Sequence, residues 1–287
     1  MKIENAIIIA AGASSRFAPL SYERHKALTI VRGEVLIERL IAQLRSAGIN
    51  DIYIVSGYKA EQFEYLREKC GVVLIPNAEY LYRNNNSSIW AARDVLGNSL
   101  ILASDLFFAE NPFAAEAEDS WYAAEYAEGQ TKEWCLSIDG EGYIDSVTIG
   151  GENAWYMTDH AFWSAEFSRK FLQILEAEWQ ESAGKLWETI FAEHLDVLKM
   201  RVKKYSPHTV FEFDSLDALR EFDDSYRADS RSEIMRSIAR ELISSEGDII
   251  NLRPVMGSGA EATGFTFDCG GHSYEYRYEA GEMSERT

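Results

Sequence analysis

Short apolar runs alternate with helical patterns over the first third of the chain. Within residues 34–47, apolar side chains at positions 36, 37, 40, 41 and 44 recur at the spacing of an amphipathic helix. Strands that alternate with helices are typical of βαβ units, so this part predicts a doubly wound, mostly parallel sheet. The predicted strands are Ala6–Ala11, Ile52–Ser56, Val72–Ile75 and Leu100–Ala103, and the further helices are Ala60–Lys69 and Ser87–Leu96.

The pattern changes near residue 120, where strand-like segments follow one another with little helix between them. These segments are Trp121–Tyr126, Glu133–Ile138, Tyr143–Thr148 and Ala154–Phe162. Helices predicted over Ala165–Ala177 and Gly184–Glu193 lead to short strands and to a closing helix that ends near Tyr226. We therefore expect a β-rich half beside the first, parallel half.

A polar stretch, Tyr226–Arg231, predicts a domain boundary. We expect an α/β domain over residues 1–226, made of a nucleotide-binding half (1–119) and an acceptor-binding half (120–226). Residues 227–287, with one helical and three strand-like segments, are expected to form a small α+β appendage.

Composition and charge narrow the classes of function. The chain has 287 residues, a formal net charge of −19 and no apolar run long enough to span a membrane, and its start lacks the pattern of a signal peptide. Because nucleic-acid phosphates require clustered Lys and Arg, we expect no nucleic-acid partner. The three cysteines have no metal-ligand spacing, which favours a reducing, cytoplasmic location without disulfides.

The first predicted strand flows into a turn of small residues that carries the strongest chemical signal. Ile7-Ile8-Ile9 is followed by Ala10-Ala11-Gly12-Ala13-Ser14-Ser15-Arg16, and His25-Lys26-Ala27-Leu28 comes soon after. Small residues let the backbone approach a ligand, and their N–H groups can point at phosphate oxygens. Arg16 and Lys26 add positive charge to an acidic protein. From these residues alone, an ordinary turn with two surface cations remains an alternative.

The whole string resembles the signature of the nucleotidyltransferases that attach a nucleoside monophosphate to a phosphorylated small molecule, and within them the bacterial CTP:phosphocholine cytidylyltransferases. Ser14 stands where that signature usually has glycine, and His25 where it has proline. The resemblance implies a Rossmann-like fold with Lys26 compensating charge on the transferring phosphate and Arg16 holding the β- and γ-phosphates. It also implies that the nucleotide contacts the turn formed by Ala10, Ala11, Gly12, Ala13, Ser14 and Ser15.

Carboxylates are expected to hold Mg²⁺, because nucleotidyl transfer needs positioning and charge compensation more than a general base. Asp105 follows a buried strand in the sequence LILASDLFF, where the family has a metal-binding Asp; capping the next turn is the alternative. KLWETIF resembles the Trp-acid motif of related enzymes and implies Glu188 as the second metal ligand, with an exposed helix acid as the alternative. YLYRNNNSSIWAA resembles the cytidylyltransferase pattern and places Asn84, Asn85 and Ser88 beside the nucleotide, although loop or N-cap roles stay open.

Aromatic residues suggest the acceptor. Six of the seven tryptophans lie between residues 121 and 187. Quaternary ammonium groups cannot donate hydrogen bonds, and aromatic faces with nearby carboxylates hold them. TKEWCL and HAFW resemble the choline-side strands of the family, which makes Trp134 and Trp163 the first choline-binding candidates. Tyr126, Trp187 and Glu133 are secondary candidates, and core packing is the alternative for several of these rings.

The sequence thus predicts a cytidylyltransferase that transfers CMP from CTP to phosphocholine with Mg²⁺, giving CDP-choline and pyrophosphate. Three other acceptors remain open: a sugar-1-phosphate, an inositol phosphate or phosphoethanolamine. A non-catalytic nucleotide-binding module is a further alternative because of the Ser14 and His25 departures. Residues 227–287, with Gly257-Ser258-Gly259, resemble the start of a choline-kinase-like N-lobe. We expect no kinase activity from this segment.

Overall fold

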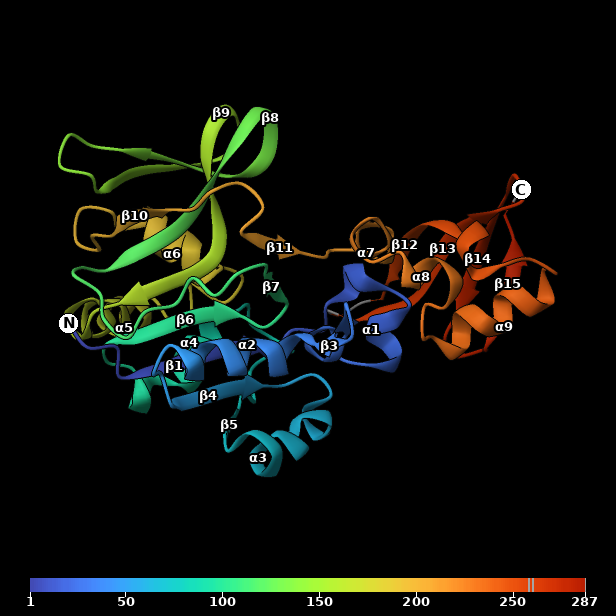
Figure 1. The fold of residues 1–287 in the computed structure, drawn as a ribbon, viewed down its shortest axis with the longest axis horizontal. Coiled ribbons are helices and arrows are strands. Elements are labelled where there is room, and N and C mark those ends of the chain that lie inside the picture. Colours follow the sequence, from blue (N-terminus) through green and yellow to red (C-terminus); the bar gives the residue numbers. More distant parts are fainter. Residues whose placement is uncertain (258, 260, 287) are drawn as a thin grey trace. The chain divides into compact units, whose positions relative to one another are not determined.

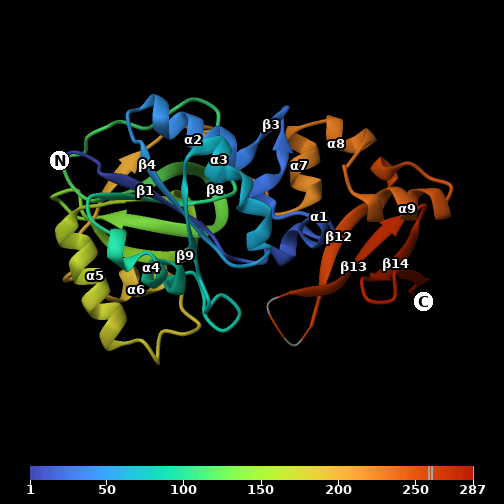
Figure 2. The ribbon, with the colours of Figure 1, turned by 90° about the horizontal axis from the view of Figure 1, so that it is seen from below.

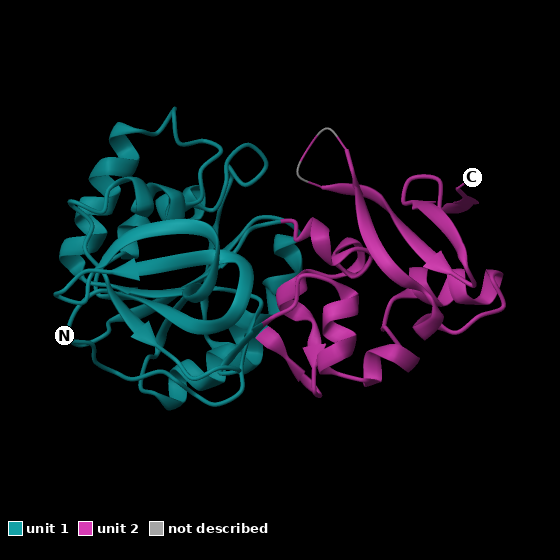
Figure 3. Ribbon diagram, turned by 90° about the horizontal axis from the view of Figure 1, so that it is seen from above, with its two compact units in different colours: residues 1–12, 37–211 teal, residues 13–36, 212–287 magenta. Residues whose placement is uncertain are grey.

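The chain folds into two compact units. The computed structural model describes residues 1–257, 259 and 261–286, so Ser258 of the glycine-containing run lies outside the described residues. Unit 1 comprises residues 1–12 and 37–211, and unit 2 comprises residues 13–36 and 212–287 (Figure 3). These units do not follow the sequence-based boundary after residue 226, which stays a prediction about domain organisation.

Unit 1 is built on a seven-stranded sheet of order β10-β8-β9-β6-β1-β4-β5 (Figure 1). The strand β1 is parallel to both of its neighbours, β4 and β6, and Ile7 and Ile8 in its centre are fully buried. A strand buried on both faces reads as a continuous apolar run, as in the predicted parallel half. The strands of this sheet are β1 Asn5–Ala10, β4 Asp51–Ser56, β5 Val73–Pro76, β6 Ser99–Ala103, β8 Trp121–Ile138, β9 Ile144–Trp163 and β10 Arg201–Lys204, and β7 Leu106–Phe108 pairs with β11 Val210–Glu212 in a separate two-stranded sheet.

Helices cover both faces of this sheet. Figure 2 shows α2 on one face and α4, α5 and α6 on the other. The buried face of α2 includes Leu36, Ile37, Leu40, Ile41 and Leu44, as the periodicity predicts. The bounds are α2 Leu36–Ser46, α3 Tyr65–Cys70, α4 Asn86–Ala91, α5 Ala165–Ala177 and α6 Trp187–Glu193. The doubly wound, mostly parallel fold that the sequence predicts is confirmed.

The β-rich half is dominated by two long antiparallel strands, β8 (Trp121–Ile138) and β9 (Ile144–Trp163) (Figure 1). The sequence predicts four separate strands over the same residues. Register shifts interrupt the pairing of β8 with β9, and Gly129 and Gly150 have positive φ near those shifts. Such irregularities break the alternation of polar and apolar residues, so each strand looks like two shorter ones in the sequence.

Unit 2 combines the segment after the first turn with the C-terminal part of the chain. Its four-stranded sheet has the order β12-β13-β14-β15 and is antiparallel throughout. The bounds are α1 Leu20–Glu23, β2 Ile30–Val31, β3 Glu34–Val35, α7 Leu216–Phe222, α8 Ser225–Ala228, α9 Glu233–Glu241, β12 Ile250–Met256, β13 Ala262–Cys269, β14 His272–Arg277 and β15 Glu282–Glu285.

Specific contacts tie segment 13–36 to the rest of unit 2. The Tyr22 ring stacks on Tyr278 with centroids 3.8 Å apart. The Ile234 N–H donates to the Glu23 carboxylate (3.0 Å), and the Tyr226 hydroxyl donates to the Ile30 carbonyl (2.6 Å). The predicted phosphate segment is therefore an integral part of the unit that holds the C-terminal sheet.

None of the helices in the described ranges is long and apolar enough to cross a membrane.

Candidate active site

The end of β1 leaves open space beside its backbone. A Cβ built on Gly12 would meet no heavy atom within 4 Å. At the end of the neighbouring strand β4 the packing is tight, because a Cβ on Gly57 would lie 2.9 Å from the Ala11 carbonyl oxygen. The Tyr58 N–H donates to that carbonyl (3.0 Å). The backbone at Gly12 is thus accessible to a ligand, as the predicted nucleotide contact requires.

Ser14, at the position where the signature usually has glycine, has a backbone conformation that favours glycine. Its φ of 50° and ψ of 43° lie in the left-handed region, which costs a non-glycine residue about 1 kcal/mol or more. The Ser14 carbonyl accepts a hydrogen bond from the Phe17 N–H (2.9 Å), which closes the turn over Ser15–Phe17. The serine therefore keeps the shape of the turn at an energetic cost.

His25 likewise keeps the conformation of the proline that is usual at its position. Its φ of −59° is within the range that a proline ring imposes. The buried His25 ring also accepts a hydrogen bond at Nδ1 from the Ala27 N–H (3.1 Å), so it caps the short helix Lys26–Leu28. A proline could not supply this side-chain cap. At both departures from the signature, the backbone thus has dihedral angles that the usual glycine or proline can also adopt.

The two predicted transfer cations lie together around one carboxylate in unit 2. Arg16 Nη1 is 2.7 Å from Asp214 Oδ2, and Lys26 Nζ is 3.5 Å from Asp214 Oδ1 and 3.6 Å from Glu212 Oε1. The Lys26 side chain is only 5% exposed, and a buried ammonium needs such partners. An arriving phosphate would compete with these carboxylates for the same two cations.

The sequence interpretation did not single out Glu212 and Asp214 as partners of these cations. The N-cap of α7 is Ser215, whose hydroxyl accepts a hydrogen bond from the Ala218 N–H (3.1 Å), so the Asp214 carboxylate is not the cap. Glu212 and Asp214 are two residues apart at the end of β11, and that spacing was the available signal, because alternate residues of an extended chain share a face.

Asp105 lies in the turn directly after β6, and its side chain is half-buried. This places a carboxylate at the carboxyl end of a parallel strand, where ligands of such sheets bind. Carboxylate oxygens are the ligands that Mg²⁺ prefers, so the chemistry of this residue fits the predicted metal.

Glu188 is buried in the first turn of α6, with 8% of its surface exposed. Burial raises the pKa of this carboxyl to about 7, while hydrogen bonds from Asn85 and Tyr122 act to lower it. Asn85 Nδ2 donates to Glu188 Oε2 at 3.0 Å. A cation bound beside Glu188 would therefore favour the ionised form of its carboxyl group.

The asparagines of the NNNSS run bind the loop that precedes α6. Asn84 donates from its backbone N–H to the Ala183 carbonyl (2.9 Å), and Asn85 Oδ1 accepts from the Trp187 N–H (2.7 Å). Ser88 is buried, and its hydroxyl accepts from Asn77 Nδ2 (3.1 Å). The structure thus brings Asn84 and Asn85 together with Trp187 and Glu188, and gives each of them a protein partner. Their role at a nucleotide stays a prediction.

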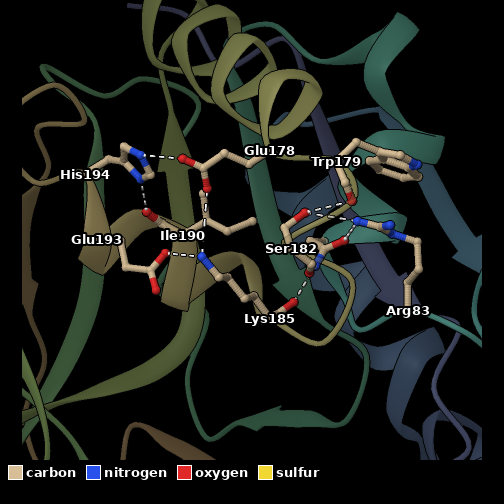
Figure 4. Close-up of polar contacts among 9 residues, drawn as sticks. Arg83, Glu178, Trp179, Ser182, Lys185, Ile190, Glu193 and His194 are labelled. Atoms are coloured by element: carbon tan, nitrogen blue, oxygen red, sulfur yellow. Dashed lines mark hydrogen bonds and ion pairs between the residues drawn. The ribbon is translucent and has the colours of Figure 1, made fainter.

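A cluster of charged side chains joins the end of α5 and this loop to the end of α6 (Figure 4). Within the described ranges, Glu178, Glu193 and His194 form the one group of three His, Cys, Asp or Glu residues whose ligand atoms lie within 4.8 Å of one another. His194 Nε2 is 2.9 Å from Glu178 Oε1, and Lys185 Nζ is 2.5 Å from Glu193 Oε2. Because the lysine already supplies a cation to this group, we interpret it as an ion-pair network that fixes the loop.

The predicted choline-binding residues fall into two environments. Trp163 is fully buried, with ring centroids 4.6 Å from Phe171 and 5.1 Å from Trp187, and Trp187 is 2% exposed. These two indoles pack in the apolar core of unit 1, so the geometry gives them a packing role and their part in a cage is without support. Trp134 is half-buried, and Glu133 is exposed.

Tyr126 lies in a more exposed environment than Trp163 and Trp187. It is 36% exposed and meets Trp155 edge-on at 5.3 Å, opposite it in the β8–β9 pairing. Lys204 Nζ lies 4.7 Å from the Trp155 ring centroid, which shows that this ring face accommodates a cation. Next along β9, the Tyr156 hydroxyl donates to the buried Glu125 (3.2 Å). Trp155, which the sequence analysis did not select, is thus a better cation-binding ring than Trp163.

Comparison with known proteins agrees with this architecture. The family model described as "MobA-like NTP transferase domain" matches residues 6–141. A 2-aminoethylphosphonate cytidylyltransferase from Lancefieldella rimae is 34% identical, covering 77% of this chain and 93% of the relative. A choline-phosphate cytidylyltransferase from Streptococcus pneumoniae is 30% identical, covering 76% of this chain and 96% of the relative. The chain belongs to the cytidylyltransferases of the nucleotidyltransferase superfamily.

A solved structure supports the membership of this family. The CTP:phosphocholine cytidylyltransferase of Streptococcus pneumoniae superposes with a TM-score of 0.73 at 29% identity, covering 78% of this chain and 99% of that one. The inositol-1-phosphate CTP transferase of T. maritima shares the fold, with a TM-score of 0.60 at 15% identity. The prediction of a nucleotidyltransferase enzyme is confirmed.

Proposed function

We propose that the protein transfers CMP from CTP to phosphocholine, releasing pyrophosphate and CDP-choline. The observation that carries the transfer chemistry is the position of Lys26, a buried ammonium that shares the Asp214 carboxylate with Arg16. Two cations held together by acids are ready to exchange those acids for phosphate oxygens when an anionic substrate arrives. Relatives that use CTP and that cover most of this chain support cytidine as the base.

In the proposed reaction an oxygen of phosphocholine forms a bond to the α-phosphorus of CTP, and the bond from that phosphorus to the bridging oxygen of pyrophosphate breaks. The attacking oxygen is ionised at neutral pH, so no general base is required. Lys26 compensates charge at the transferring phosphate, and Arg16 binds the β- and γ-phosphates that leave. Both groups act through charge and position, which explains why the site needs no nucleophilic side chain.

Asp105 and Glu188 would hold Mg²⁺, which when bound neutralises phosphate charge and orients the leaving group. Asp105 fits this role through its place at the carboxyl end of β6. Glu188 fits it through its burial, because a bound cation would keep its carboxyl ionised. We propose that the acidic side chains of Glu212 and Asp214 keep the two cations in place until the nucleotide binds.

Phosphocholine is the proposed acceptor because aromatic rings that are not fully buried and carboxylates occur together on β8 and β9. Tyr126 and Trp155 offer ring faces, and Glu133 adds negative charge beside Tyr156. A quaternary ammonium is bound by such faces without hydrogen bonds. The relative from Lancefieldella rimae favours a second candidate acceptor, 2-aminoethylphosphonate, whose primary ammonium would instead donate hydrogen bonds to carboxylates.

A panel of acceptors tests the proposal. The full chain is incubated with CTP, Mg²⁺ and phosphocholine, 2-aminoethylphosphonate, phosphoethanolamine, inositol phosphate or a sugar-1-phosphate, and pyrophosphate release is measured. We expect kcat/KM to be highest with phosphocholine. Equal values for phosphocholine and phosphoethanolamine would contradict the aromatic cage, and the highest value with 2-aminoethylphosphonate would select the second acceptor. Binding of CTP without turnover of any acceptor would favour a non-catalytic module.

A further inference from the structure

Unit 2 contains a pocket with a charged lining that the proposed reaction does not use. It has a volume of about 660 Å³ and lies among α1, the start of β2, and helices α8 and α9. Its charged lining consists of Arg24, Arg231 and Arg236 with Glu23 and Glu233. Three guanidinium groups against two carboxylates leave one positive charge in a chain whose formal net charge is −19. Local positive charge in an acidic protein indicates a site for an anion.

The carboxylates of this pocket are already engaged. Glu23 Oε1 accepts a hydrogen bond from the Ile234 N–H at the start of α9 (3.0 Å). Glu233 Oε1 is 2.9 Å from Arg236 Nη1, one turn along the same helix. Glu233 thus forms an ion pair with Arg236, and two carboxylates face three guanidinium groups. The acids therefore do not neutralise all three guanidinium groups.

Two of the arginines differ in how firmly they are held. The Arg231 guanidinium lies 4.0 Å from the Tyr226 ring centroid and donates to the Ile30 carbonyl (3.1 Å) and to the Ser225 hydroxyl (3.0 Å). Arg24 is exposed, and within the described residues its side chain has no hydrogen-bond or ion-pair partner. Arg231 is therefore held in place as part of the pocket wall, whereas the N–H groups of the Arg24 guanidinium can donate hydrogen bonds to a ligand.

We propose that this pocket binds the phosphate group of a small organic phosphate, with Arg24 and Arg236 contacting the anion and Arg231 shaping the wall. Guanidinium forks match phosphate oxygens in pairs, which favours Arg over Lys at such sites. The volume is within the range of small-molecule sites, so it holds an organic group as well as the phosphate. This pocket is separate from the Arg16, Lys26 and Asp214 cluster in its lining residues.

The position of the pocket in the chain suggests an effector role. Arg24 directly precedes His25 and Lys26, and as the C-cap of α1 it donates its own N–H to the carbonyl of Leu20, the first residue of that helix. An anion held by Arg24 therefore restrains the residues that lead into the proposed transfer lysine. We expect hydrogen exchange of the Ala27 and Leu28 amides to slow when the pocket is filled.

Site-resolved protection of arginines tests the binding proposal. The full chain is treated with phenylglyoxal at constant ionic strength, with and without inorganic phosphate or glycerol 3-phosphate, and each modified arginine is quantified by mass spectrometry. We expect both phosphates to slow the modification of Arg24 and Arg236. Glycerol 3-phosphate should have this effect at a lower concentration than inorganic phosphate. Arg227, an exposed arginine of the same unit, is the matched control and should not be protected.

Variants complete the test. Arg236→Gln removes one charged hydrogen-bond donor. The glycerol 3-phosphate concentration at which the modification rate of Arg24 is halved should therefore rise by about tenfold. Arg227→Gln and Arg16→Gln should leave that concentration unchanged. Equal protection of Arg24 and Arg227, or equal protection by acetate at the same ionic strength, would overturn the proposal. Because neither CTP nor an acceptor is present, the result does not depend on the proposed transfer activity.

Discussion

The two units present their functional candidates in different ways. In unit 2, Arg16 and Lys26 both form ion pairs with Asp214, which is 198 residues after Arg16 in the sequence. A phosphate can compete with Asp214 for these two cations. In unit 1, Asn85 and Glu188 hydrogen-bond to each other, and Trp163 and Trp187 pack in the core. A motif residue held by exchangeable ion pairs is thus a better functional candidate than one that completes a core.

The largest expected effect tests the cation cluster of unit 2. Lys26→Ala should lower kcat by about a thousandfold with every acceptor, because the charge that compensates the transferring phosphate is lost. Steady-state kinetics measure this effect, and circular dichroism checks the fold. Lys69→Ala is the matched control, since Lys69 is exposed and pairs with Glu38 in unit 1. An unchanged kcat for Lys26→Ala would remove the assignment.

The next prediction concerns the buried His160 in unit 1 and the dependence of stability on pH. Burial lowers the pKa of His160 to about 3, and its ring nitrogens contact the Thr158 carbonyl (2.8 Å) and the Tyr205 hydroxyl (3.2 Å). The unfolded chain takes up a proton near pH 6.5 and the folded chain does not, so stability should fall as the pH drops from 6.5 toward 3. By pH 4 the loss is on the order of 3 kcal/mol.

Urea unfolding of the wild type and of His160→Gln at pH 7 and pH 4.5 measures this loss. The variant should lose less stability than the wild type between the two pH values, because its amide does not titrate. His272, an exposed histidine of unit 2, provides the matched control in His272→Gln. An equal loss in His160→Gln and the wild type would show that other groups cause the acid sensitivity.

A smaller effect separates the exposed rings of unit 1 from the buried ones. Tyr126→Ala should raise KM for phosphocholine by about tenfold and leave KM for CTP unchanged, because it removes one face of the proposed cage. Tyr82→Ala changes a ring that is 77% exposed and serves as the control. A rise in KM for both substrates would indicate a general change in the fold of β8 and β9.

The smallest effect concerns the strained turn of unit 2. Ser14→Gly should increase the free energy of unfolding by up to about 1 kcal/mol, because glycine adopts the left-handed conformation without a steric cost. Thermal and urea unfolding measure this gain. The control Ser46→Gly, at the end of α2, should instead decrease stability. A loss of stability in Ser14→Gly would show that the serine side chain has a compensating contact.

Much of the fold could be predicted because it rests on local patterns. The continuous apolar run Ala6–Ala11 predicts a strand buried on both faces, and β1 has that place. The spacing within Ala165–Ala177 predicts α5 with the same bounds. The long strands β8 and β9 were predicted as fragments, because shifts in their pairing are set by the partner strand and interrupt the local pattern.

The candidate site was predictable only where a motif is continuous in sequence. The turn after β1, with Arg16 and Lys26, and Asp105 after β6 could be read from short strings. The acids that pair with the two cations could not be predicted, because Asp214 lies far along the chain and local residue spacing does not indicate such a long-range contact. Trp163 and Trp155 look alike as sequence letters, and only their burial separates them.

Local sequence is enough to predict the nature of the chemistry: small residues after a buried strand, two cations in an acidic chain, and a carboxylate at a strand end. Which of these groups meet depends on the packing of the whole chain. It placed the phosphate segment with the C-terminal sheet in unit 2, gave Lys26 its carboxylates and put Trp163 in the core. The physical reason is that propensity and periodicity act over a few residues, whereas burial and ion pairing depend on every element that packs around a side chain.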